Sequence, residues 1–159
     1  MPTVPVPRFL RACTWLLLVP AAAFLAAFLA SFAQAEGASL VVQNAWARKP
    51  PGADTAAVYF VLTNQGTKPV TIVGASSTLA THVMIHETSL VEGQSRMRMR
   101  DKITLAPGKA QAFAPEGLHV MLSGFKYDVI VGDTMHVTLQ LQDGGRIDVA
   151  ALVRPLDAQ

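Results

Sequence analysis

The stretch GLHVMLSG, Gly117–Gly124, predicts a short β-strand bounded at both ends by glycine. Successive side chains of a strand point to opposite faces, so residues of equal parity share a face. The apolar face, which we expect to pack on the core, consists of Leu118, Val120 and Leu122. His119 and Met121 share the other face. Taken alone, this pair is better explained as a hydrogen-bonded core histidine beside a methionine that fills a gap in the packing than as a metal site.

Similar short runs continue along the chain on both sides of this strand. From Ser39 onward, apolar and β-branched residues alternate with turn residues, and no amphipathic helix is evident. This pattern is typical of an all-β protein and predicts eight or nine strands in a Greek-key sandwich or barrel. The expected strands are 39–46, 56–64, 69–76, 82–90, 95–100, 109–114, 117–124, 134–142 and 146–153.

The N-terminal segment predicts export. It begins with a basic region, continues as the uncharged run 13–33, and ends in Ala33-Gln34-Ala35, an A-x-A site. These features are typical of a secretory signal peptide, so we expect cleavage after Ala35, a domain over residues 36–159 and a short tail at 154–159. The apolar run is also just long enough to span a bilayer, which leaves an uncleaved membrane anchor as the alternative.

The exported part is electrically balanced and has no cysteine. It has eleven Lys or Arg residues and eleven Asp or Glu residues, because Arg8 and Arg11 lie in the signal segment. A neutral domain has no basic field to hold nucleic acid or an anionic membrane. The only cysteine, Cys13, stands at the very start of the apolar run, two residues after Arg11, a position that does not fit a lipoprotein site. The exported part therefore has no thiol nucleophile, redox pair or thiolate ligand.

Sequence signatures of enzymes are absent. Ser123 lies in LSG rather than GxSxG, and the sequence has neither a glycine-rich phosphate loop nor an HExxH motif. We therefore expect that the protein is not an enzyme.

Histidine and methionine are the remaining chemically distinctive residues. After residue 35 they are His82, Met84, His86, Met97, Met99, His119, Met121, Met135 and His136. A hairpin turn at Glu92-Gly93 would pair His86 with Met99 and place Met97 on the diagonal. Taken alone, SRMRMR (95–100) is explained by methionine in the core and arginine in solvent. His82, Met84, Met135 and His136 are weaker candidates, and we interpret Met135 and His136, which point to opposite faces, as structural.

Imidazole and thioether together point to one metal. Thioether sulfur is soft and uncharged, so it suits Cu(I) and is a poor ligand for Zn(II), Mg(II) or Ca(II). A blue-copper electron-transfer site requires a cysteine thiolate, which the exported part lacks. Binding and transfer of Cu(I) is the activity that remains.

The spacing of these residues resembles a known motif. His86, ten residues, Met97, twenty-one residues, and His119-Val120-Met121 match the H-x10-M-x21-H-x-M motif of the periplasmic copper chaperone (PCuAC) family, and the resemblance runs from about Asn44 to Val153. It implies a periplasmic, cupredoxin-like β domain that binds one Cu(I) and delivers it to the copper A centre of cytochrome c oxidase. The implied metal ligands are His86, Met97, His119 and Met121.

One departure from the family leaves the ligand set open. Many members have a further methionine just after the first histidine, where this chain has Glu87 and Thr88, so Met84 or Met99 is a possible substitute. The implied partner is a copper-accepting protein, either cytochrome c oxidase subunit II or another periplasmic copper chaperone. Two other functions stay open: a periplasmic copper buffer or resistance protein, and a non-metal β-sandwich interaction module that is membrane-tethered if the N-terminal segment is uncleaved.

Overall fold

The computed structural model describes residues 40–157. The expected signal peptide and its cleavage site lie outside this range. Between residues 40 and 157 no helix is present that could cross a membrane. The strands in this range are β1 (Leu40–Arg48), β2 (Thr55–Asn64), β3 (Val70–Ser76), β4 (Ala80–Val91), β5 (Gln94–Met99), β6 (Ile103–Leu105), β7 (Ala110–Phe113), β8 (Leu118–Phe125), β9 (Thr134–Leu141) and β10 (Arg146–Arg154).

Nine of these ten strands were expected from the sequence, with ends that differ by at most two residues. The strand that sequence reasoning missed is β6, because three residues are too few to show alternation. The all-β prediction is confirmed.

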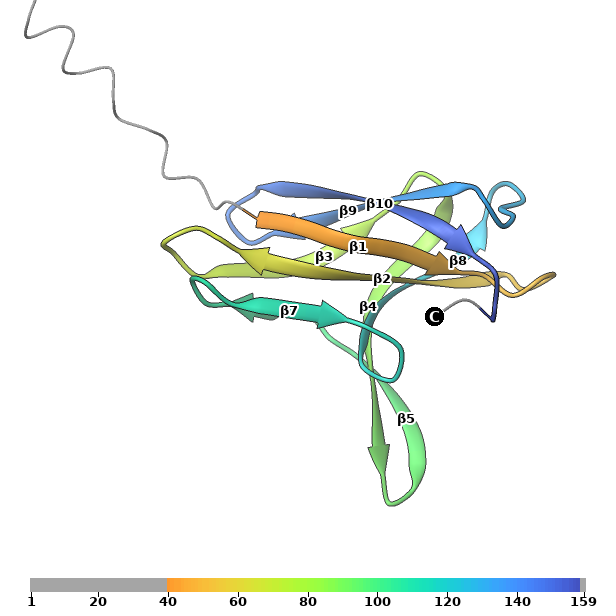
Figure 1. Ribbon diagram of the computed structural model, residues 1–159, viewed down its shortest axis with the longest axis horizontal. Coiled ribbons are helices and arrows are strands. Elements are labelled where there is room, and N and C mark those ends of the chain that lie inside the picture. The colour runs from red at the N-terminus through yellow and green to blue at the C-terminus, as the bar shows by residue number, and fades with distance from the viewer. Residues whose placement is uncertain (1–39, 158–159) are drawn as a thin grey trace, which may run out of the picture. The chain divides into compact units, whose positions relative to one another are not determined.

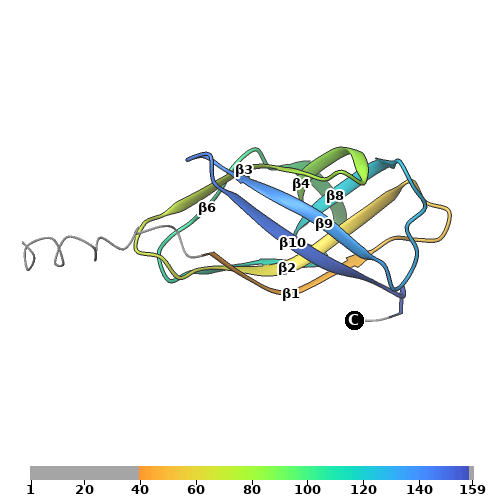
Figure 2. The ribbon, with the colours of Figure 1, turned by 90° about the horizontal axis from the view of Figure 1, so that it is seen from above.

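The strands form one continuous hydrogen-bonded path in the order β5-β4-β8-β2-β1-β10-β9-β3-β6, and β7 also pairs with β2. Neighbours are antiparallel except β1 and β10, which are parallel. Contacts between β3 and β4 bring distant parts of the path together, so the sheet folds round on itself (Figures 1 and 2). The result is the sandwich or barrel that the sequence predicted.

The core fills the interior of this folded sheet. In β9 the burial alternates residue by residue, as a strand with one inward face requires. The largest fully buried apolar side chains are Phe60, Leu62, Ile72, Leu122, Met135 and Leu139. Phe60 of β2 stacks on Phe113 of β7 with ring centroids 4.2 Å apart, which fixes β7 against the sheet. In β8, Val120 and Leu122 are fully buried, as the sequence predicted.

Strands β4 and β5 extend away from the rest of the sheet as a two-stranded hairpin (Figure 1), here called the arm and comprising residues 86–99. β5 is an edge strand, and all six of its residues are exposed. Met97 and Met99 are 53% and 58% exposed. The interpretation of SRMRMR as a strand with methionine in the core is therefore wrong, because the arm extends beyond the core.

Candidate metal centre

Three strands bring the histidines and methionines onto one face of the sheet. The register of β4 with β8 places His86 opposite His119, and Met84 opposite Met121. The register of β4 with β5 places Met99 opposite His86, which confirms the predicted hairpin register. Directly opposite side chains lie close enough to touch on a shared face, and diagonal ones lie within reach of long side chains.

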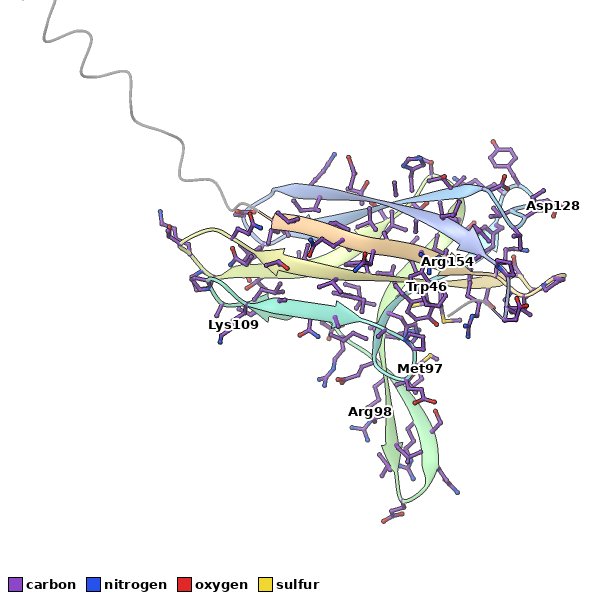
Figure 3. The ribbon with its side chains drawn as sticks, viewed as in Figure 1. Trp46, Met97, Arg98, Lys109, Asp128 and Arg154 are labelled. Carbon is purple, nitrogen blue, oxygen red and sulfur yellow. The ribbon has the colours of Figure 1, made fainter. Side chains whose placement is uncertain are left out.

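Met97 has a diagonal position relative to His86, because it pairs directly with Thr88. Figure 3 shows Met97 on the Trp46 side of the arm and Arg98 on the opposite side. The alternation of β5 thus separates its methionines from its arginines, as the sequence predicted.

His86 occupies the middle of the site. Its ring lies edge-on to that of His119, with the centroids 5.9 Å apart and the planes at 78°. Nδ1 of His86 is buried and has no hydrogen-bond partner. Burial lowers the pKa of His86 below its usual 6.5, and the neighbouring His119 lowers it further. Near neutral pH the ring is therefore uncharged and has a free lone pair.

A buried polar atom without a partner is uncommon and costs free energy, so His86 Nδ1 calls for an explanation. A bound metal ion would supply the missing partner, because neutral imidazole nitrogen is a common metal ligand.

His119 is held in place more firmly. It is only 5% exposed, and its Nδ1–H donates a hydrogen bond to the carbonyl oxygen of Gly117, 3.0 Å away. This bond fixes the tautomer and leaves Nε2 with its lone pair available for a ligand. Gly117 closes a turn with Ala114, in which Glu116 has a φ of 63°. The same Gly117 carbonyl accepts a bond from the backbone N–H of Thr88, which ties the turn to the arm.

An aromatic wall, which sequence reasoning missed, closes one side of the site. The ring of Tyr59 lies 6.2 Å from that of His119 and 4.5 Å from that of Trp46. Arg48 and Arg154 lie over the Trp46 ring at 5.3 Å and 5.5 Å, and Figure 3 shows Arg154 beside Trp46. Burial raises the pKa of Tyr59, so the phenol stays neutral near pH 7. The register of β1 with β2 pairs Trp46 with Tyr59 just after an irregularity in β1, so the sequence pattern carried no signal for this wall.

A pocket of about 290 Å³ opens beside His119, and His86 is not part of its lining. Met97, His119 and Met121, three of the four predicted ligands, line it together with Tyr59 and Glu116. A larger hollow of about 880 Å³ lies between residues 49–54 and 125–131, but its lining contains no histidine or methionine. The smaller pocket is therefore the one with metal-binding chemistry.

Of the remaining histidines and methionines, some lie near the site and others lie elsewhere in the domain. Met84 lies half-buried on the site face opposite Met121, whereas Met99 is exposed opposite His86. Met135 is fully buried in the core, while its neighbour His136 is exposed. These two thus point to opposite faces, as expected.

The nitrogen and oxygen side chains near His86 and His119 do not form a metal site by themselves. Within residues 40–157, no three His, Cys, Asp or Glu side chains converge in a way that could hold a metal ion. Two imidazoles alone leave a tetrahedral or trigonal metal underliganded, and the thioethers on the same face are further donors that suit a soft metal ion.

Comparisons with known proteins identify the family of this chain. Residues 40–153 match the family described as "Putative lipoprotein LpqE-like". "Putative lipoprotein Lxx21020" of Leifsonia xyli is 32% identical over 122 residues, which cover 76% of this chain and 72% of that protein.

Solved structures of PCuAC domains share the fold. The Cu(I) form of DR1885 from Deinococcus radiodurans is 33% identical, with a TM-score of 0.58 over 82% of this chain and 87% of that one. The copper-bound PCuAC domain from PmoF2 is 24% identical, with a TM-score of 0.59 over 74% of this chain and 95% of that one. The fold is thus cupredoxin-like, and the chain belongs to the LpqE-like lipoprotein family.

Proposed function

We propose that this protein is a copper chaperone that binds one Cu(I) per chain through His86, Met97, His119 and Met121. The observation that carries the proposal is the buried, unpartnered Nδ1 of His86, which lies on the same face as a second histidine and several methionines. The copper-bound PmoF2 domain and the Cu(I) form of DR1885 support the choice of metal.

The donor chemistry favours Cu(I) over other metals. Two neutral imidazoles and two thioethers add no negative charge, and thioether sulfur prefers a soft monovalent ion. A thioether needs no deprotonation and cannot form a disulfide, so such a site keeps its ligands in an oxidising compartment. The motif spacing and the donor chemistry thus support the same metal.

Delivery of the metal follows from the same ligands. Thioethers bind Cu(I) less tightly than thiolates, so an acceptor with cysteine ligands can remove the ion by stepwise ligand exchange. We propose the copper A centre of cytochrome c oxidase as the destination, reached through subunit II or through another periplasmic copper chaperone. The H-x10-M-x21-H-x-M spacing supports this destination.

We also propose that the domain works outside the cytoplasm, as residues 36–159 released by cleavage after Ala35. The basic start, apolar run and A-x-A site support export. The lipoprotein names of the relatives support export as well. Intact-mass measurement of the exported protein tests the cleavage site, since an uncleaved chain would retain the mass of residues 1–35.

A chelator competition tests the proposed function. The domain 36–159 is titrated with Cu(I) against a chromogenic chelator, and the double variant His119→Ala/Met121→Leu is compared with the parent. We expect the parent to withdraw one equivalent of copper and the double variant to withdraw little. Equal affinity in the two proteins would mean that the assigned site is wrong.

A further inference from the structure

The arm carries positively charged side chains that have no part in the proposed binding of copper. β5 presents Arg96 and Arg98 on the face opposite its two methionines, and both arginines are exposed. Neither side chain makes an ion pair or a side-chain hydrogen bond within the part of the chain that the structure describes. Arg100, by contrast, forms an ion pair with Glu87.

Further arginines lie near the site although the domain as a whole is neutral. Arg48 and Arg154 flank Trp46, at the end of the aromatic wall that leads from His119. The acidic residues nearby that lack an ion pair are Glu116 at the pocket, Glu92 at the tip of the arm and Asp101 just after β5. Because the exported part contains equal numbers of acidic and basic residues, this local excess of arginine means that charge is unevenly distributed around the site.

The exposure of the ligands defines the side from which an acceptor must approach. His119 is buried against the sheet, whereas Met97 lies on the arm and is half exposed. In a stepwise exchange the acceptor's thiolate first contacts the metal where the existing ligands are most exposed. An acceptor therefore approaches over the arm, within the field of Arg96 and Arg98.

We propose that the arm is the docking element for copper acceptors with an acidic surface, and that Arg96 and Arg98 steer them to the metal. This inference rests on the proposed function. Steering needs no direct contact, since charges act over a Debye length of about 30 Å at 0.01 M salt and about 8 Å at physiological ionic strength. Complementary charge mainly accelerates encounter and contributes less to final affinity.

A competing explanation is that the arginines protect the edge of the sheet. β5 pairs only with β4 among the described strands, and charged side chains on an edge strand discourage pairing with other chains. The two explanations differ in what they predict. Protection of the edge affects aggregation alone, whereas steering affects the rate of copper transfer from the monomer.

The test measures transfer of Cu(I) from the loaded protein to two labelled peptides by stopped-flow fluorescence. Both peptides contain the same pair of cysteines, flanked by glutamates in one and by glutamines in the other. At low salt we expect the acidic peptide to accept copper about ten-fold faster. The ratio should fall towards one at high salt and in Arg96→Gln/Arg98→Gln.

The matched control is Lys109→Gln/Arg146→Gln, which removes the same charge from an exposed loop position and an exposed position on β10; Figure 3 shows Lys109 at the left end of the domain, off the arm. This control should keep the ten-fold preference. Arg96→Lys/Arg98→Lys keeps the charge and should also keep the preference, which guards against misfolding or aggregation of the glutamine variant.

The outcomes separate this inference from the proposed function. If the parent binds Cu(I) but transfers it to both peptides at the same rate, the docking proposal is overturned and the chaperone proposal stands. An equal loss of preference in the Lys109/Arg146 control would also overturn it, because net charge would then explain the effect. Failure of the parent to bind Cu(I) at all overturns both.

Discussion

The two halves of the proposed copper site differ in what holds them. On β8, His119 and Met121 alternate with Val120 and Leu122, which are fully buried, and the Gly117 carbonyl fixes the His119 ring. On the arm, Met97 and Met99 belong to a strand with every residue exposed. Core packing therefore positions one half of the site, while the other half is positioned by hairpin pairing and by the backbone bond from Thr88 to Gly117.

This difference suits a protein that must both hold and release its metal. Ligands fixed by the core need no ordering when copper binds, which favours affinity and selectivity. Ligands on an exposed hairpin can leave the metal without disturbing the core. His86 lies between the two, opposite His119 on one side and Met99 on the other.

The largest expected effect is on stability, when a leucine is replaced by alanine in each of the two halves. Leu122→Ala removes a fully buried side chain from the β8 half and should lower the free energy of unfolding by about 2–5 kcal/mol. Leu90→Ala truncates an arm residue that is 76% exposed, so it should change the free energy of unfolding by less than about 0.5 kcal/mol. Urea unfolding followed by Trp46, the only tryptophan after residue 35, measures both. Similar losses would show that the arm is packed as firmly as β8.

The second prediction concerns copper affinity at the fixed half. His119→Ala should weaken Cu(I) binding by more than about 100-fold, because loss of a ligand exceeds the 10–100-fold effect of losing an outer-shell partner. His136→Ala, which alters an exposed histidine on β9, is the control and should bind as the parent does. Chelator competition measures both variants. An unchanged affinity in His119→Ala would contradict its assignment as a ligand.

The third prediction decides which methionine of the arm is a ligand. Met97→Leu keeps the size and apolar character of the side chain and should weaken Cu(I) binding about ten-fold, equivalent to about 1.4 kcal/mol. Met99→Leu should have little effect, since Met97 and not Met99 lines the pocket with His119. The reverse order in chelator competition would assign the arm ligand to Met99.

The smallest expected effect is a dependence of apo-protein stability on pH. The pKa of His86 is lowered below 6.5 by burial and by His119, so the folded state favours the neutral ring. Its contribution to stability is present above the unfolded pKa and is lost as the pH falls through the folded pKa. The urea midpoint should therefore fall between about pH 7 and about pH 5, and it should fall less in His86→Asn. An identical pH profile in the variant would exclude His86 as the source.

The sequence predicted the fold well because alternation and turn residues are local signals. The Glu92-Gly93 turn even predicted the pairing of His86 with Met99, since the length of the turn sets the register. The exposure of Met97 and Met99 was not predictable in this way. Alternation identifies the two faces of a strand, but it does not show whether the strand extends beyond the core.

The residues that surround the site also could not be predicted from local sequence patterns. Met84 and Met121 are separated by more than thirty residues in sequence, and only the register of β4 with β8 places them opposite each other. The wall formed by Tyr59 and Trp46 likewise depends on the order β8-β2-β1, which the sequence pattern does not show. The assignment of His86, Met97, His119 and Met121 as ligands stays a prediction.

X-ray absorption spectroscopy of the Cu(I)-loaded domain tests the central claim most directly, because it counts sulfur and nitrogen ligands. We predict two sulfur and two nitrogen neighbours for the parent, one sulfur fewer in Met97→Leu and one nitrogen fewer in His119→Ala. A first shell of nitrogen and oxygen alone, or a spectrum unchanged by both substitutions, would contradict a copper site shared between β8 and the arm.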